Sequence, residues 1–183
     1  GLAGVDEAGR GPLAGDVFAA AVILPPNVVI EGLNDSKKLS EKKREQLYET
    51  IVGCAAAYAV ARVSSEEIDQ LNIRNATYRA MNLAVDRLGD QPKFVLIDGD
   101  AVTEMSLPHE CIIGGDGKSQ AIAAASILAK VSRDRYMIEV DKQYPQYGFA
   151  RHKGYGTAEH VEALRLYGPC PIHRETFLSK ILG

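Results

Sequence analysis

The sequence is poor in the residues that build disulfide frameworks and zinc sites. It has three cysteines in 183 residues, Cys54, Cys111 and Cys170, and no Cys-x-x-Cys pair. A sparse, odd number of cysteines is typical of reduced thiols in a cytosolic protein. We therefore expect neither structural disulfides nor a zinc site.

Long hydrophobic runs are also missing. A membrane-spanning helix needs about 20 consecutive apolar residues, and no run in this sequence approaches that length. The first residues do not form a recognisable signal peptide. The sequence has neither a heptad pattern nor a large apolar stripe that would indicate self-association. We expect a monomer in the cytoplasm with no membrane partner.

A strong positive charge, which is common in nucleic-acid-binding proteins, is absent from the chain as a whole. The net charge is −3, but it is unevenly distributed. Residues from Lys118 onward carry a net charge of +4, and those before it carry −7. Because a binding face depends on its local electric field, the distribution permits nucleic-acid binding that the overall charge disfavours.

The hydrophobic pattern predicts one mixed α/β domain, a sheet flanked by helices, over residues 1–183. Residues from about 145 to 183 are expected to form a C-terminal appendage of helices and loops. Irregular backbone is predicted for 144–159, which is rich in Gly, Pro and aromatic residues. Apolar runs predict strands within 1–8, 15–25, 56–64, 93–100 and 110–119. Helices are predicted after Ser40, twice within 64–89, from Ser119 to about Lys142, and near 158–167 and 176–182.

Four acidic residues stand where a predicted strand ends or a loop begins: Asp6, Glu7, Asp98 and Asp116. Any one of them could be a turn former or a helix cap. As a group, carboxylates without histidine or cysteine are typical ligands of hard divalent cations such as Mg²⁺ or Mn²⁺. Two such ions about 4 Å apart can promote phosphodiester hydrolysis. Asp100 is an alternative to Asp98, which we prefer because it directly follows the apolar run.

The adjacency of Asp6 and Glu7 is a geometric difficulty for a shared site. Neighbouring residues of a strand point to opposite faces of the sheet. Ala8 and Gly9 follow immediately, so the strand can end or bend there, and the longer glutamate side chain can reach further. Spacing alone leaves the pairing of these two carboxylates open.

Basic residues and glycines recur in the predicted loops. Gly9-Arg10-Gly11 would let a ligand approach the backbone closely, although a flexible turn with a solvated arginine has the same pattern. Tyr155 lies between two glycines in a basic loop, where it could stack on a sugar or base or be buried. Phosphate contacts are predicted for five further residues, each of which could instead be a solvated surface group: Lys37, Lys38, Lys118, Ser119 and Arg174.

These motifs together resemble the ribonuclease HII family, the bacterial type 2 ribonucleases H. The resemblance extends over the whole chain in the order GVDEAGRGPLAG, LNDSKKLS, VLIDG, GGDGKS, AAASILAKVSRDR, QYGFARHKGYGT and HRETF. It implies a ribonuclease H-like fold and an endonuclease that uses two Mg²⁺ or Mn²⁺ ions. The implied substrates are RNA–DNA hybrids and duplex DNA containing single ribonucleotides, as in ribonucleotide excision repair.

The resemblance also implies roles for particular residues. The family's four acidic ligands correspond to Asp6, Glu7, Asp98 and Asp116. The Gly9-Arg10-Gly11 motif would read the 2′-hydroxyl at the RNA–DNA junction, and Tyr155 would stack on the following deoxyribose. Asp134, within the predicted long helix, is taken as a supporting residue.

Two other functions remain open from the sequence. A ribonuclease HIII-like enzyme would share the core, but Arg10 and the short chain favour the HII type. A non-catalytic module that binds hybrids would leave the acidic cluster without a purpose. Substrates with one or with four or more ribonucleotides separate the HII and HIII types. Binding that survives chelation, with no cleavage after metal is added, would identify the non-catalytic module.

Overall fold

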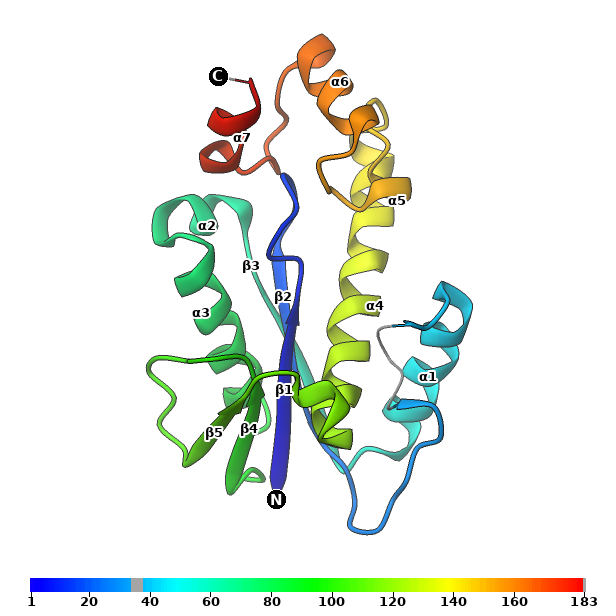
Figure 1. Cartoon of the computed structure of the whole chain (residues 1–183), viewed down its shortest axis with the longest axis vertical. Coiled ribbons are helices and arrows are strands. Elements are labelled where there is room, and N and C mark those ends of the chain that lie inside the picture. Colours follow the sequence, from blue (N-terminus) through cyan, green and yellow to red (C-terminus); the bar gives the residue numbers. More distant parts are fainter. Residues whose placement is uncertain (34–37, 183) are drawn as a thin grey trace.

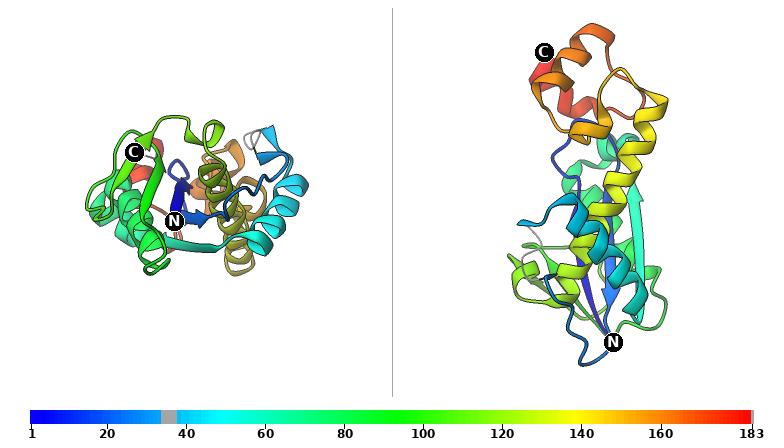
Figure 2. Two further views of the ribbon diagram at one scale, coloured as in Figure 1. Left: turned by 90° about the horizontal axis from the view of Figure 1, so that it is seen from below. Right: turned by 90° about the vertical axis from the view of Figure 1, so that its right-hand side faces the viewer.

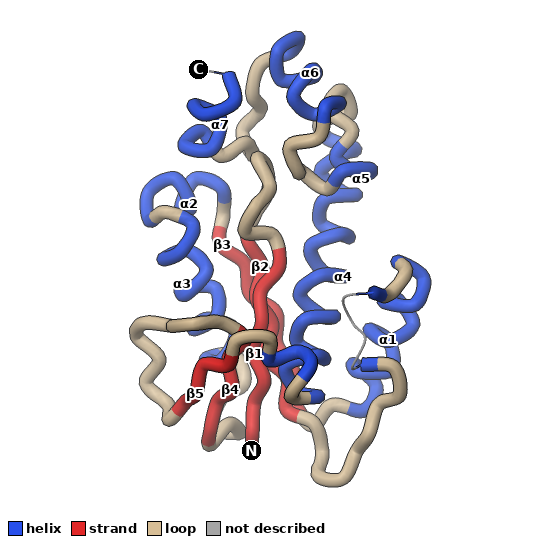
Figure 3. Tube along the Cα trace, in the orientation of Figure 1, coloured by secondary structure: helices blue, strands red, loops and turns tan. Residues whose placement is uncertain are grey.

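A computed structural model of the chain describes residues 1–33 and 38–182, except for the side chain of Asp116. A five-stranded sheet lies at its centre in the order β3-β2-β1-β4-β5 (Figures 1 and 3). The first three strands pair antiparallel, and β4 and β5 add parallel to β1. The strands are β1 Leu2–Ala8, β2 Val17–Ile23, β3 Ala57–Val63, β4 Phe94–Asp98 and β5 His109–Ile112. The predicted fold class, a mixed sheet flanked by helices, is confirmed.

Helices cover both faces of the sheet. The helices are α1 Glu41–Cys54, α2 Ser65–Leu71, α3 Ile73–Asp86, η2 Gly115–Gly117, α4 Gln120–Gln143, α5 Phe149–His152, α6 Ala158–Tyr167 and α7 Glu175–Leu182. Helix α3 packs against one face, and α4, with α1 outside it, packs against the other (Figure 1). Among the described residues, no helix combines the length and apolar character of a membrane span.

The alternation of side chains along the strands divides the core into two halves. In β2, Ala19 and Ala21 face α3, whereas Ala20 and Val22 face α4. β1 has a glycine on its α4 face because a Cβ at Gly4 would overlap with the backbone of Ala121. This close packing brings α4 directly beside the strand that carries Asp6 and Glu7.

Side-chain caps start several helices where the sequence predicts them. Ser40 accepts a hydrogen bond from the amide of Lys43, and Ser119 accepts one from Ile122. Thr157 caps α6 in the same way. The predicted starts of the three helices therefore agree closely with the structure.

The residues after α4 pack with Leu13, Ala14 and the end of α4 in a third hydrophobic cluster beyond the sheet. Helices α5, α6 and α7 gather at the end of the molecule opposite to the start of β1 (Figure 2). The prediction of irregular backbone throughout 144–159 is wrong in part, because Phe149–His152 form one helical turn. Phe149 is fully buried against Tyr147, and this packing stabilises a turn that the glycines on either side do not predict.

Candidate active site

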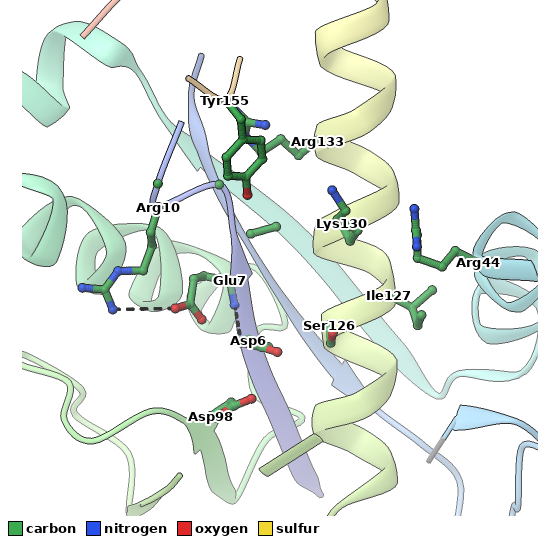
Figure 4. Close-up of a pocket in the computed structure, with 13 residues that line it drawn as sticks. Asp6, Glu7, Arg10, Arg44, Asp98, Ser126, Ile127, Lys130, Arg133 and Tyr155 are labelled. Carbon is green, nitrogen blue, oxygen red and sulfur yellow. Dashed lines mark hydrogen bonds and ion pairs between the residues drawn. The ribbon is translucent and has the colours of Figure 1, made fainter. Parts of the chain in front are cut away.

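A pocket opens at the carboxyl ends of β1 and β4, next to α4 (Figure 4). Parallel strands end at the same edge of a sheet, where ligand sites of α/β proteins commonly form. The pocket is lined by Asp6, Glu7, Ala8, Gly9, Arg10, Gly11, Arg44, Asp98, Ser126, Ile127, Lys130, Arg133 and Tyr155. It therefore brings together residues that are separated by almost 150 positions in the sequence.

The strand register places two of the acids side by side. Val5 of β1 pairs with Ile97 of β4, and the next residue on each parallel strand is Asp6 or Asp98. Both continue the face that packs against α4. Of the two candidates near this strand end, Asp98 lines the pocket and Asp100 does not.

Glu7 joins the two aspartates although it follows Asp6 directly. Its amide donates a hydrogen bond of 2.8 Å to Asp6 Oδ1, and Figure 4 shows its carboxylate near the same end of β1. Glu7 is the next-to-last residue of β1, where the side chain can extend past the strand end. The geometric difficulty raised by their adjacency is resolved, since both side chains line the pocket.

The three carboxylates interact electrostatically. Burial raises the pKa of Asp6 well above its ordinary value, and a side-chain hydrogen bond with Glu7 and the charges of Glu7 and Asp98 raise it further. The hydrogen bond from the Glu7 amide acts in the opposite direction and lowers this pKa. Asp98 Oδ1 also lies 3.4 Å from the amide nitrogen of Gly115, which donates to it. A site with this much negative charge is stabilised by a proton or a cation.

The donor set suits a hard divalent cation in its chemistry, because every candidate ligand is a carboxylate oxygen. Within the described side chains, no group of three or more Asp, Glu, His or Cys has the geometry of a metal site. The fourth predicted ligand, Asp116, lies in η2 beside β4, and its side chain is outside the described part.

The loop after β1 forms the next wall of the pocket. Arg10 is exposed, and its Nη1 lies 3.7 Å from Glu7 Oε1. Gly9 is buried with a φ of 90°, and a Cβ there would overlap with the side chain of Arg133. Glycine is needed at this position both for its backbone conformation and for the close approach of the arginine.

Tyr155 faces the same loop from the C-terminal appendage. Its side chain lies about 3.5 Å from the position a Cβ would take at Gly11, and it is 42% exposed. The tyrosine is available at the pocket surface and is not buried in a loop core. Its neighbour Gly154 accepts a hydrogen bond of 2.8 Å from the amide of Leu13, which ties the two loops together.

The wall opposite Arg10 consists of residues for which the sequence predicts no contact with substrate. Lys130 Nζ lies 3.1 Å from Asp134 Oδ1, and Arg44 Nη2 lies 4.0 Å from the other carboxylate oxygen. Asp134 is buried, so it holds both cations at the pocket. In the sequence, the spacing of Ser126, Lys130 and Arg133 along one helix face was the available signal.

One predicted phosphate contact is wrong. Arg174 was expected at the surface, but it is fully buried and its guanidinium binds backbone carbonyls of the loop after β1. The neighbouring His173 is also buried. An arginine at the start of a short helix has the same local sequence in either environment, and only packing distinguishes them.

Of the other predicted phosphate contacts, the three that the structure describes do not line the pocket. Lys38 and Lys118 are exposed, and the side chain of Ser119 caps α4. Lys37 lies outside the described residues. Among the described side chains, the structure thus brings together Asp6, Glu7 and Asp98 with the glycine motif and the tyrosine, and it leaves Lys38 and Lys118 outside the pocket.

Comparison with known proteins gives a consistent result. Residues 3–180 match the family model described as Ribonuclease HII. The chain is 56% identical over 182 residues to a Ribonuclease HII of Caldicellulosiruptor bescii, covering 100% of this chain and 88% of the relative. It is 57% identical over 176 residues to a Ribonuclease HII of Coxiella burnetii, covering 96% and 87%.

Solved structures show the same architecture. The ribonuclease H2 of Pyrococcus horikoshii superposes with a TM-score of 0.81 at 27% identity, covering 96% of this chain and 92% of that one. The ribonuclease HII in a complex with PCNA from Archaeoglobus fulgidus also superposes with a TM-score of 0.81, at 26% identity, covering 100% and 95%.

Proposed function

Because the chain belongs to the ribonuclease HII family, a family of metal-dependent nucleases that act on RNA–DNA substrates, we propose a specific reaction for it. The enzyme hydrolyses the RNA strand of hybrids and cuts on the 5′ side of single ribonucleotides in duplex DNA. The products carry 3′-hydroxyl and 5′-phosphate ends. The observation that carries this proposal is the meeting of three strand-end carboxylates, a glycine loop and an exposed tyrosine in one pocket.

We assign the four acids to metal binding. Asp6, Glu7 and Asp98 converge at the pocket, and Asp116 completes the set in this proposal. Two Mg²⁺ or Mn²⁺ ions, when bound, supply Lewis acidity and charge neutralisation to phosphodiester hydrolysis. The chain's proposed contribution is to hold four carboxylates together against their mutual repulsion. Burial, together with the charges of Glu7 and Asp98, already raises the pKa of Asp6.

The loop and the tyrosine would recognise the sugar. The loop of Gly9, Arg10 and Gly11 lines the pocket, and the exposed residues Arg10 and Gly11 lie where a 2′-hydroxyl can approach. This hydroxyl is what distinguishes RNA from DNA. Tyr155 would stack on the deoxyribose that follows the ribonucleotide. Because Tyr155 lies close to Gly11, one protein surface would contact both sides of an RNA–DNA junction.

Contacts to the nucleic-acid backbone would extend beyond the pocket. We propose them for Lys38, Lys118 and Ser119, which belong to the described part, and for Lys37, which lies outside it. Such contacts orient a duplex without reading its sequence. Replacing one of these lysines should weaken binding uniformly and reduce the dependence of affinity on salt.

The test is cleavage of an end-labelled DNA duplex that contains one ribonucleotide, with Mg²⁺, Mn²⁺ or EDTA. We expect one cut, on the 5′ side of the ribonucleotide, only with metal. Asp6→Asn and Asp98→Asn should each reduce the rate by at least about 100-fold, because loss of a charge-stabilising group at the reacting phosphate costs that much. Wild-type rates in both variants would contradict the proposed site.

Two other outcomes would identify different functions. Efficient cutting only where four or more ribonucleotides occur in succession would indicate a ribonuclease HIII-like specificity. Binding of hybrids that persists in EDTA, with no cleavage after addition of metal, would indicate a non-catalytic module.

We further propose that the enzyme acts as a monomer in the cytoplasm, in ribonucleotide excision repair. Light scattering at the concentration used for cleavage tests the oligomeric state. A dimer there would refute this part of the proposal and leave the reaction intact.

A further inference from the structure

Arg174 lies at the junction between the C-terminal appendage and the loop after β1. Its side chain is fully buried, and it comes from the segment just before α7. The backbone of the same segment pairs with the loop, since Arg174 N donates to Leu13 O at 2.8 Å and Gly15 N donates to Ile172 O at 2.9 Å. The C-terminal segment is therefore attached to the loop by both its backbone and this side chain.

The guanidinium of Arg174 binds four carbonyl oxygens of that loop. Nη2 donates to Gly9 O at 2.6 Å, and Nη1 donates to Arg10 O at 3.0 Å. Nη1 also donates to Pro12 O at 2.8 Å, and Nε to Gly15 O at 2.9 Å. Only the planar fork of an arginine carries enough donors in a fixed geometry to reach all of these oxygens.

These bonds determine which way two peptide groups face. In a trans peptide the carbonyl and the amide N–H point in opposite directions, and the described residues contain no cis peptide bond. Arg174 draws the carbonyls of Gly9 and Arg10 inward, so the N–H groups of Arg10 and Gly11 point outward. Neither N–H donates a hydrogen bond to another described residue, and both residues are exposed and line the pocket.

The burial of this charge also indicates a role beyond packing. Taking an arginine out of water is costly, and the described residues include no carboxylate within ion-pair distance of its guanidinium. A well-packed apolar side chain would fill the same space with less desolvation. The arginine is explained by what it does to the loop carbonyls.

We propose that Arg174 is a positioning residue for ribonucleotide recognition. By binding the carbonyls of Gly9 and Arg10, it presents the N–H groups of Arg10 and Gly11 to the pocket as donors for the 2′-oxygen of the substrate. The proposal rests on the proposed function, and it assigns the selectivity of the site for a ribonucleotide to a residue that does not itself touch the substrate.

The experiment compares two fluorescein-labelled duplexes that differ only in one ribonucleotide or deoxynucleotide. Binding is measured by fluorescence anisotropy with Ca²⁺ in place of Mg²⁺, and the ratio of the two dissociation constants gives the selectivity. Arg174→Lys should reduce this ratio about tenfold, the value expected for losing one well-formed hydrogen bond. Its affinity for the all-DNA duplex should change little.

Two controls separate positioning from other roles. If Arg174 acted only through its charge, Arg174→Gln would weaken the binding of both duplexes equally, and Arg174→Lys would bind both as the wild type does. That result would overturn the proposal. Leu178→Ala removes a buried side chain from the adjacent α7 and should lower the melting temperature without changing the selectivity. If Leu178→Ala lost as much selectivity as Arg174→Lys, the effect of Arg174 would be merely structural, and the proposal would also be overturned.

The wild-type protein provides an independent measurement if the Arg174 variants do not fold. Amide hydrogen exchange should be fast at Arg10 and Gly11 in the free enzyme and slow in the complex with the ribonucleotide duplex, but not with the all-DNA duplex. Exchange that is unaffected by either duplex would refute the outward orientation. Absence of any wild-type preference between the duplexes would instead refute the proposed function.

Discussion

Acidification should destabilise the protein through a pair of buried histidines. His160 Nε2 lies 2.8 Å from His173 Nε2, and both side chains are nearly inaccessible to solvent. The amide of Cys170 donates to His173 Nδ1, so the proton of a neutral His173 is on Nε2. His173 Nε2–H then donates to His160 Nε2, and His160 Nδ1–H donates to the carbonyl oxygen of Tyr155. Every partner is satisfied only when both rings are neutral.

The size of the effect follows from the pKa of His173. Burial, together with the charges of His160 and His152, lowers this pKa to about 4. The ordinary value of about 6.5 applies to the unfolded chain. As the pH falls, the unfolded chain takes up the proton first, so the free energy of unfolding decreases between about pH 6.5 and pH 4. Linkage gives a loss of about 2 kcal/mol at about pH 5.

A variant isolates this contribution from that of other groups. Burial raises the pKa of Asp6 and of Asp16, so these two carboxyls oppose the histidines as the pH falls. His173→Gln keeps an amide near the position of Nε2 but does not titrate. Between about pH 7 and pH 5, the wild type should therefore lose about 2 kcal/mol more stability than His173→Gln.

Urea unfolding at both pH values measures the difference. Far-UV circular dichroism is the suitable probe, because the chain contains no tryptophan. With a slope of about 2 kcal/mol per molar urea, the midpoint should fall by about 1 M more in the wild type. His109→Gln, at the exposed start of β5, should behave as the wild type does. Equal pH responses of the wild type and His173→Gln would refute the reasoning.

Two further variants test the walls of the pocket. Gly9→Ala should lower the free energy of unfolding by about 1–3 kcal/mol, because the residue has a φ of 90° and an alanine Cβ would overlap with Arg133. The matched change Gly53→Ala, in helix α1 with open space around it, should stabilise by about 0.5–1 kcal/mol, and equal melting temperatures of the two variants would contradict this account. Asp134→Asn should lower the free energy of unfolding, measured with urea, by about 1–3 kcal/mol, since it leaves Lys130 and Arg44 without their shared carboxylate. That loss should be smaller in a Lys130→Met background, and strict additivity would exclude the coupling.

Much of the fold follows from local rules that act within a few residues. The helix that begins after Ser119 is recognisable because a cap and an alanine-rich run lie next to each other in the sequence. Strand ends are recognisable in the same way, because Asp98 directly follows an apolar run. The acids at those ends could be named as candidate ligands because parallel strands finish at one edge.

The environment of each side chain depended on contacts between distant segments. The partners of Arg174 lie about 160 positions earlier in the chain, and the histidine pair joins α6 to the segment before α7. Neither has a local signature, because a buried and a solvated arginine or histidine can have the same neighbours in sequence. The basic wall of Arg44 and Lys130 is likewise formed only when α1 packs on α4.

The sequence by itself determined the order of helices and strands apart from α5, the acids at the strand ends and the glycine motif, because hydrophobic period, capping and backbone conformation are local properties. Tertiary structure decided that Asp6 and Glu7 share a pocket, that Arg174 faces inward and that the Arg10 and Gly11 amides face outward. The last two outcomes depend on which carbonyls a buried guanidinium can reach, and that is determined by how the C-terminal segment packs against the loop after β1.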